Sequence, residues 1–420
     1  MHAESEADRL RQAFRQPTQV VTDFGHSQSY ERTEEWVRPL LSRVPISRVT
    51  NVTPIDGEVV LPIWSATTPL ARDLTVHAGK GRTSAASRVS AIMEAIERVC
   101  AEELPDRRVA ARSYNELVAD EGHDVVLDPE LCHLPFDTTY HADKQISWTV
   151  GLDLLADTYV WIARDLVISP PRDGVCLGVE TTGLASGNTL VEAALHALYE
   201  LVERDAVATE SFTYMHCEAT DADAAELRLI DPDTVGGTPR LLIAELSGCA
   251  LRVRIQELTN ELGIPVFGAL VIDEQFPGAE GDLVSFAGYG ADLDPERALV
   301  RALMEAAQGH AIVMLGARDT FEGTTALPDR TAMLLRRAAL HHSGNLVPFP
   351  RRVYQSGSPG DQLKIVSARL RACGITRIAV VDLTREDLEI PVVRLIVPGL
   401  DLPYGASSRR PGARLLRQIV

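Results

Sequence analysis

The chain has 420 residues, of which 45% are hydrophobic and 24% are charged, and it carries a net charge of −18 at pH 7. A chain of this length can bury a large core, and the composition is ordinary for a globular protein. The acidic balance argues against a protein that binds the phosphate backbone of nucleic acids, because that affinity comes from Lys and Arg.

The sequence gives no sign of secretion, membrane insertion or a cysteine framework. Its first residues, MHAESEADRLRQ, are charged where a secretory signal would be apolar, and no apolar run reaches the length of a membrane span. The six cysteines include no CxxC pair, which disfavours a zinc ribbon or a disulfide scaffold. We therefore predict a cytoplasmic protein with free thiols and no membrane partner.

The N-terminal part of the chain is predicted to lead into short strands. Residues 1–45 mix charge with two short helical patterns, at 7–14 and 33–42, and are predicted to form a peripheral or partner-facing segment. β-rich runs then predict strands near 47–53 and 58–65.

The run LTVHAGKG, residues 74–81, is predicted to be a strand that enters a glycine turn. Backbone amides at such a turn can hold an anion, and Lys80 can reach a phosphate. The spacing is not that of a Walker A loop, because Gly81 stands where Ser or Thr should follow the lysine. Taken alone, the motif is also typical of a surface turn with a solvated lysine.

Two helices are predicted to begin after Thr83 and Thr189, because threonine is a good N-cap and apolar residues then recur at helical spacing. Glu192, three residues after Thr189, is predicted to complete a capping box. The second helix repeats the first at a distance of 106 residues: Gly187, Thr189, Ala197, Glu200, Glu203 and Arg204 correspond to Gly81, Thr83, Ala91, Glu94, Glu97 and Arg98.

The segments around the second helix are predicted to be mainly strands and loops. Residues 107–175 contain a short helix at 114–119 and a hairpin over 148–163, with its turn near Ala156. After the second helix we predict a helix at 235–247 and strands at 251–258, 265–273 and 282–292.

A third, weaker copy follows the last of these strands. Asp294 is the predicted N-cap, Pro295 takes the first helical position, and Glu305 lies eleven residues past the cap, as Glu94 and Glu200 do. Gln308 replaces the second acid of the pair.

The C-terminal third is predicted to contain a helix at 331–341, a helix at 362–373 and strands at 377–383 and 391–397. Breaker residues within 316–363 indicate either a lid or a plain linker. The basic tail after the last strand could be a solvated end or a functional one.

The recurring acids predict a metal site. Glutamates three residues apart lie on one helical face, and several such pairs facing inward would collect the hard oxygen ligands of Mg²⁺, which binds together with substrate phosphates. A single ExxER face is more typical of a solvated helix with local ion pairs. The recurrence of the pair, and the apolar residues around it, favour a shared buried site.

Five motifs in order resemble the YcaO family over roughly residues 45–400. They are GKG, SAIMEAIER, GLASGNTLVEAALHALYELVERDA, RALMEA and VVDLTREDLEIPVVRLIVPGL. The resemblance implies an α/β (α+β) fold of the YcaO type, with repeated strand, glycine-turn and acidic-helix units around one ATP and Mg²⁺ site. It divides the chain into a peripheral segment (1–45), a catalytic domain (46–400) and a basic tail (401–420).

The resemblance also implies the site. Metal ligands are expected at Glu94, Glu97, Glu200, Glu203 and Glu305. Asn188, Glu192, Arg204 and Arg301 match family positions near the nucleotide or its phosphates. With Lys80, the arginines 204 and 301 are the expected catalytic cations, since phosphoryl transfer needs positioning and charge neutralisation.

Members of the family use ATP and Mg²⁺ to activate a backbone amide of a ribosomally made peptide. A nucleophile adds to the amide carbon, and the resulting oxyanion is phosphorylated and expelled, giving an azoline, a macrocyclic amidine or a thioamide. Many members read TNG where this chain has Thr181-Thr182-Gly183, and azoline-forming members commonly end in a Pro-rich tail that this chain lacks. The resemblance therefore favours the stand-alone or TfuA-associated type.

The expected partners are a precursor peptide and a TfuA-like or other accessory protein, with self-association left open. The alternative function is a catalytically idle ATP-binding scaffold that assists a peptide-maturation enzyme. Loss of the acids would favour the scaffold, and all five are present.

Overall fold

The computed structural model describes residues 2–20, 22, 25–53, 61–104, 110–177, 180–216, 228–277, 283–314, 346–351, 357–403 and 409–417. Across these ranges, no helix is both long enough and apolar enough to cross a lipid bilayer. The predicted helix at 331–341 lies outside the described residues, as does most of the 316–363 segment.

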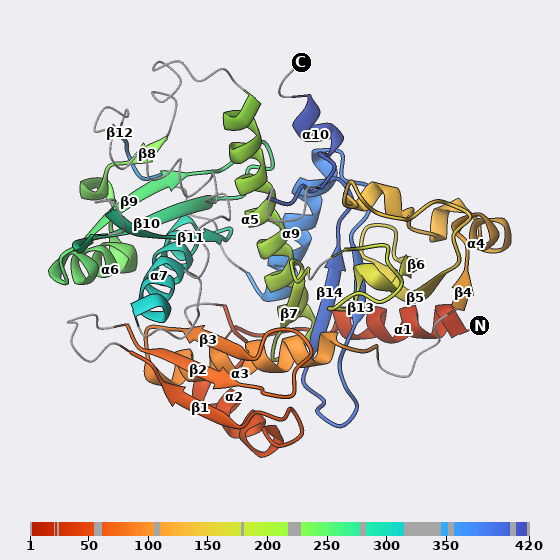
Figure 1. Ribbon diagram of the computed structural model, residues 1–420, viewed down its shortest axis with the longest axis horizontal. Coiled ribbons are helices and arrows are strands. Elements are labelled where there is room, and N and C mark those ends of the chain that lie inside the picture. The colour runs from red at the N-terminus through yellow and green to blue at the C-terminus, as the bar shows by residue number, and fades with distance from the viewer. Residues whose placement is uncertain are drawn as a thin grey trace.

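Three β-sheets form the framework (Figure 1). The first contains, in spatial order, β1 (Arg48–Asn51), β2 (Ile63–Thr67) and β3 (Val76–Lys80). The second contains β11 (Leu283–Ala291), β10 (Val266–Pro277), β9 (Leu251–Glu257), β8 (Leu229–Ile230) and β12 (Leu346–Val347). The third contains β4 (Ala110–Arg112), β5 (Ile146–Asp153), β13 (Ala379–Asp382), β14 (Val392–Ile396) and β7 (Leu184–Ser186), with β6 (Thr158–Ala163) also on β5.

Antiparallel pairing dominates these sheets. Among the described strands, β8 and β12 form the only parallel pair. The helices lie between and beside the sheets rather than crossing over from strand to strand, so the fold is of the α+β type.

The three acidic helices each follow an edge strand of a different sheet. They are α3 (Ser84–Ala101) after β3, α5 (Leu190–His216) after β7, and α7 (Pro295–Met314) after β11. The Thr83 hydroxyl accepts a hydrogen bond from the Ala86 amide (3.1 Å), and the Thr189 hydroxyl accepts one from the Glu192 amide (3.1 Å). The Asp294 carboxylate accepts one from the Glu296 amide (2.9 Å). The three predicted N-caps are therefore confirmed.

The predicted capping box at Thr189 is only half right. Thr189 caps α5, but the Glu192 carboxylate does not return to the cap; it turns instead to His26, Ser27 and Asn188. A box needs the acid free to bend back to the helix start. Here partners from the N-terminal segment hold it.

Two glycines allow the strands to lie directly on the helices that follow. Gly79 and Gly290 stand four residues before the caps of α3 and α7. A Cβ at Gly79 would clash with the backbone of Ala91, and one at Gly290 would clash with the backbone of Ala298. Close strand–helix contact thus requires glycine at both places.

The three strand–helix units also contact one another in a ring. The helix α3 packs against β7, α5 packs against β11, and α7 packs against β3 (Figure 1). Each acidic helix therefore touches the edge strand that leads into the next one. Their origin as repeats of one ancestral unit stays a prediction.

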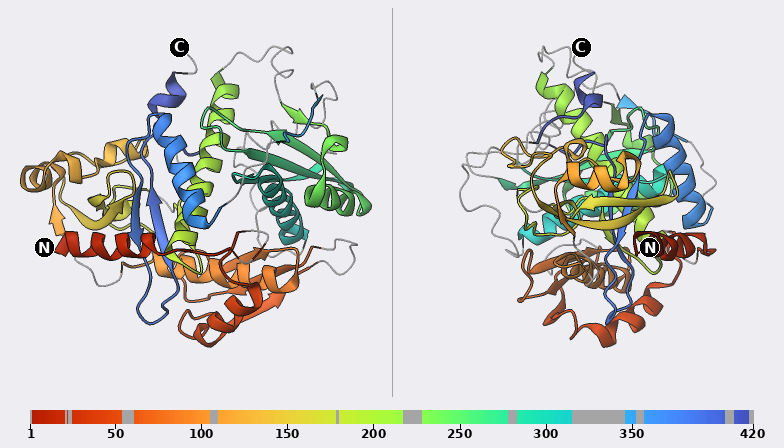
Figure 2. Two further views of the ribbon diagram at one scale, coloured as in Figure 1. Left: turned by 180° about the vertical axis from the view of Figure 1, so that it is seen from behind. Right: turned by 90° about the vertical axis from the view of Figure 1, so that its right-hand side faces the viewer.

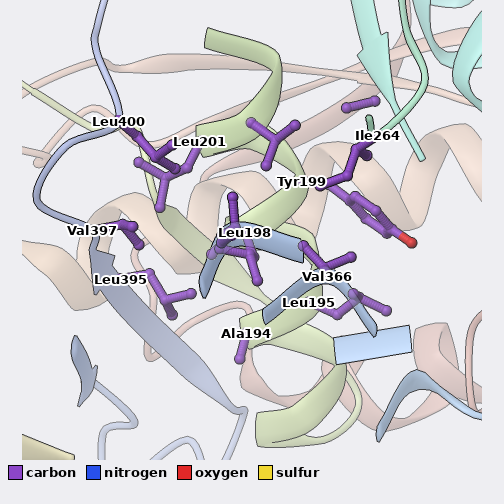
Figure 3. Close-up of a cluster of buried hydrophobic side chains, with 14 of the residues drawn as sticks. Ala194, Leu195, Leu198, Tyr199, Leu201, Ile264, Val366, Leu395, Val397 and Leu400 are labelled. Atoms are coloured by element: carbon purple, nitrogen blue, oxygen red, sulfur yellow. The ribbon is translucent and has the colours of Figure 1, made fainter. Parts of the chain in front are cut away.

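The apolar side of α5 forms the centre of the largest core cluster. Leu195, Leu198 and Leu201 pack with Val366 of α9 (Pro359–Ala372) and Leu395 of β14 (Figure 3). This packing fixes the rotation of α5 about its own axis and turns its acidic side away from the cluster.

The remaining helices agree well with the sequence patterns. They are α2 (Tyr30–Val37), α4 (Tyr114–Glu121) and α6 (Gly237–Gly248), and the predicted hairpin is formed by β5 and β6. The short helix α10 (Ala413–Leu416) lies in the tail, where no helix was predicted. The strand predicted at 58–65 begins only at Ile63 among the described residues.

The described segments near the two ends of the chain pack against the rest of the molecule. The helix α1 (His2–Arg15) packs on β5 and β6, as Figure 2 shows, and buries Ala7 and Leu10 completely. In the tail, Arg409 is buried and pairs with Glu180 (3.0 Å). The N-terminal segment is therefore less peripheral than expected, and the tail is not simply a solvated end.

Candidate active site

Five glutamates from the three acidic helices face one another at the centre of the molecule. Glu97 of α3 interacts electrostatically with Glu94 and with Glu200 of α5. Glu203 of α5 interacts with Glu200 and with Glu305 of α7. The structure thus brings together all five residues that the sequence predicted as metal ligands.

Backbone amides hold three of these carboxylates. The amide of Gly183 donates to Glu200 (3.0 Å), and the amide of Ser186 on β7 donates to Glu97 (2.9 Å). The amide of Tyr289 on β11 hydrogen bonds to Glu305. Amides fix the direction of a carboxylate without cancelling its charge, so the site stays acidic.

The pKa values reflect burial and mutual repulsion. Burial, together with the charges of Glu200 and Glu94, raises the pKa of Glu97 well above its ordinary value. Burial likewise raises the pKa of Glu203 to about 7, helped by Glu305 and Glu200 and opposed by Arg204. A divalent cation would relieve this repulsion, so the donor set fits Mg²⁺.

The glutamates do not form a closed cage. Within the part of the chain that the structure describes, no three Asp, Glu, His or Cys side chains are grouped closely enough to hold one ion by themselves. Mg²⁺ demands octahedral coordination and usually keeps waters and substrate phosphates among its ligands. The open arrangement therefore suits an ion that is shared with a polyphosphate.

Three cationic side chains border the glutamates. Lys80 of β3 donates to Glu305 of α7 (2.9 Å), and both side chains are 30% exposed. The Nε atom of Arg204 lies 3.7 Å from Glu203. These cations are the ones that the sequence predicted, and they are placed to neutralise negative charge beside the acids.

Arg301 of α7 completes this set. Its Nε atom lies 3.8 Å from the carboxylate of Asp292, and its guanidinium carbon lies 6.0 Å from the ring centre of Tyr199. That Nε atom is buried and has no hydrogen-bond partner among the described residues. Arg297 pairs with Asp292 at 2.9 Å, so Arg301 keeps hydrogen-bonding capacity for a ligand.

The predicted nucleotide residues Asn188 and Glu192 contact the N-terminal segment. Glu192 accepts hydrogen bonds from His26 (2.8 Å), from the Ser27 amide (3.0 Å) and from Asn188 (3.0 Å). The Thr33 hydroxyl donates to the Asn188 side chain (2.7 Å). Burial alone would raise the pKa of Glu192, but the bonds from His26 and Ser27 lower it to about 2.

The sequence did not predict these contacts of the N-terminal segment with Asn188 and Glu192. His26, Ser27 and Thr33 meet partners that lie 155 to 166 positions away along the chain. No local pattern in residues 1–45 distinguishes them from ordinary polar residues.

Buried charged residues outside the group of five glutamates also interact with Glu200. Arg394 of β14 is 4% exposed and interacts with Glu180 and Glu200. The tail residue Arg409 pairs with the same Glu180. Gly183, in the Thr181-Thr182-Gly183 turn, has φ +83°, which favours glycine. The amide that holds Glu200 thus comes from a turn that the tail helps to fix.

Comparison with known proteins gives consistent matches over most of the chain. The model of the YcaO family, described as a cyclodehydratase that binds ATP and Mg²⁺, matches residues 78–401. An uncharacterized protein in the tfuA 3′ region of Rhizobium leguminosarum bv. trifolii is 31% identical over 394 residues, which are 91% of this chain and 90% of that protein. An uncharacterized protein of Methanothermobacter thermautotrophicus is 31% identical over 390 residues, which are 90% and 95% of the two chains.

Solved structures agree with these sequence relatives. YcaO from Methanopyrus kandleri, bound with AMPPCP and Mg²⁺, superposes with a TM-score of 0.71 and 26% identity, covering 92% of this chain and 95% of that one. A heterocyclase in complex with substrate and cofactor has the same fold, with a TM-score of 0.73 and 22% identity over 94% of this chain and 56% of that one.

Proposed function

The chain belongs to the YcaO family, and from this premise we propose that it uses ATP and Mg²⁺ to phosphorylate a backbone amide of a ribosomally made precursor peptide. The observation that carries the proposal is the convergence of five glutamates from three helices with Lys80, Arg204 and Arg301. Few activities other than binding a metal-complexed polyphosphate require so many buried acids beside several cations.

The proposed reaction has two bond-forming steps. A nucleophile adds to the carbonyl carbon of the amide, and the oxyanion that results takes the γ-phosphoryl group of ATP, releasing ADP. Phosphate then leaves from the same carbon, and two protons pass to solvent: one from the nucleophile and one from the amide nitrogen, or both from sulfide. The product is an azoline, an amidine or a thioamide according to whether the nucleophile is a side chain, an amine or sulfide.

The residues of the chain have distinct roles in this proposal. The five glutamates would hold Mg²⁺, which would neutralise negative charge on the phosphates. Lys80 and Arg301 hold the phosphates from two sides, and Arg204 stabilises charge that develops beside Glu203. The hydrogen bonds from the amides of Ser186 and Gly183 fix the orientation of Glu97 and Glu200, which would be ligands of the ion.

The partners are proposed to be the precursor peptide and a TfuA-like protein. The relative in the tfuA 3′ region of Rhizobium leguminosarum supports the second partner. The acidic charge of the chain gives no support to a nucleic-acid partner.

Calorimetric titration of ATP into the purified protein, with and without Mg²⁺, tests the proposal. We expect Mg²⁺-dependent binding in the wild type and its loss in Glu200→Gln. Glu210→Gln is a matched control on the same helix, because Glu210 hydrogen bonds to Gln256 outside the acidic cluster. Absence of binding by the wild type, with or without peptide, would refute the proposed function, whereas Mg²⁺-dependent binding without turnover of peptide would favour the idle ATP-binding scaffold.

A further inference from the structure

His196 is exposed in the middle of a buried helix. Over residues 190–212, the part of α5 whose side chains are described, it is the only exposed residue. Its neighbours in the chain, Leu195 and Ala197, are buried. An exposed side chain at the centre of a molecule must line a hollow that opens to solvent.

The position of His196 on α5 turns it toward the acidic site. It follows Glu192 by four residues and precedes Glu200 by four, and residues with this spacing lie on one face of a helix. The opposite side of α5 holds the leucines of the core cluster (Figure 3). His196 therefore lies on the same face as the predicted nucleotide and metal residues, between them.

Charged groups from three other parts of the chain face this ring. They are Lys80 from β3, Arg301 from α7 and His26 from the N-terminal segment, and Glu192 faces it from α5 itself. The hollow at His196 is thus bordered by two of the cations that are expected to hold phosphates.

The imidazole is neutral in this setting. The dense protein surroundings, followed by the positive charges of Arg301, His26 and Lys80, lower the pKa of His196 below its ordinary value. A neutral imidazole offers one N–H donor and one acceptor nitrogen. Phosphate oxygens accept hydrogen bonds, so the N–H group is the part of the ring that suits them.

We propose that His196 is a further nucleotide-contacting residue, which donates a hydrogen bond to the phosphate chain of ATP between Lys80 and Arg301. This inference rests on the proposed function and deepens it, because it assigns a direct ligand role to a residue outside the acidic pairs.

Calorimetry of three variants tests the contact. His196→Ala should weaken the binding of Mg²⁺-ATP by roughly 10- to 100-fold, the loss expected for one hydrogen bond to a charged group, and should leave the binding of AMP unchanged. His196→Gln, which keeps an N–H donor, should recover most of the affinity, and Glu210→Gln should match the wild type. Equal affinity of wild type and His196→Ala for Mg²⁺-ATP would overturn the proposal.

Chemical modification provides a second readout that needs no variant. Diethyl pyrocarbonate reacts with unprotonated imidazole, so at pH about 5.5 an ordinary histidine, with a pKa near 6.5, is largely protected by its proton. His196 should be modified early at that pH, as mapped by peptide mass spectrometry, and Mg²⁺-ATP should protect it while AMP does not. A His196 that stays unmodified, or that is modified equally with Mg²⁺-ATP present, would count against the contact.

The two hypotheses fail in different ways. If the wild type binds no ATP under any condition, the proposed function fails and the role of His196 fails with it. If the wild type binds Mg²⁺-ATP but neither the variants nor the modification respond, only the role of His196 is refuted.

Discussion

Arg414→Ala is expected to destabilise the protein strongly, although Arg414 lies close to the end of the chain. Its guanidinium forms two bonds to the Asp205 carboxylate, at 2.7 and 3.1 Å. Asp205 follows the site residue Arg204 on α5, and its side chain is 0% exposed. The substitution would leave that buried carboxylate without its cation.

The expected magnitude follows from what remains around Asp205. Removing one partner of a buried ion pair costs about 3 to 5 kcal/mol, because the other charge stays buried. Asp205 would keep two neutral donors, the Asn260 side chain (2.9 Å) and the Asp401 amide (2.8 Å). We therefore expect a loss near the lower end, about 3 kcal/mol of unfolding free energy.

The loss should depend on pH in a defined direction. Burial raises the pKa of Asp205 even with Arg414 present, and Arg414 opposes that rise. Without Arg414 the pKa of the folded state rises further above that of the unfolded state. A carboxyl group whose pKa is higher in the folded state stabilises that state at low pH, and this stabilisation is lost as the pH rises. The difference in unfolding free energy between the wild type and Arg414→Ala should therefore be largest near pH 8 and should shrink toward pH 5.

Urea denaturation, followed by circular dichroism, measures the effect, and the tail offers a matched control. Arg410 pairs with Glu130, and both side chains are 43% exposed, so Arg410→Ala should cost no more than about 1 kcal/mol. In an Asp205→Asn background, Arg414→Ala should cost much less than in the wild type. Equal shifts for the two arginines, or full additivity with Asp205→Asn, would refute the reasoning.

Two further outcomes are expected. Glu97→Ala should weaken ATP binding at least about tenfold only when Mg²⁺ is present, since the proposed role of Glu97 is through the ion; equal weakening in a chelating buffer would contradict that role. Because the pKa of Glu192 is lowered from 4.5 to about 2, its stabilising contribution is complete above pH 4.5 and is lost as the pH falls toward 2. In acid titrations monitored by fluorescence, the stability advantage of the wild type over Glu192→Gln should therefore fall by about 1.4 kcal/mol per pH unit below 4.5, and a constant advantage would exclude this linkage.

The sequence predicted the elements whose signals are local. The caps at Thr83, Thr189 and Asp294 set the starts of three helices, and the glycines before them allowed each strand to approach its helix. Helical spacing placed each pair of acids on one face. These features depend on residues within a few positions of one another, so they can be read without the fold.

The convergence of the acids was also predictable, because acids recur at one offset in each helix; their role as metal ligands stays a prediction. Burying a carboxylate among apolar residues costs free energy, so its recurrence indicates a common function. The structure brings the five glutamates together. His196 carried a similar signal. It is a polar residue one turn from Glu192 and one turn from Glu200, on a helix that is otherwise largely apolar.

Only the tertiary structure determined the roles of the two ends of the chain. His26 and Ser27 hydrogen bond to Glu192, which was expected to form a capping box. In the tail, Arg409 pairs with Glu180 and Arg414 pairs with Asp205. The partners in these contacts lie far apart in sequence. A long-range pair leaves no periodicity or spacing in either segment, since it arises only when packing of the core has fixed where each segment runs.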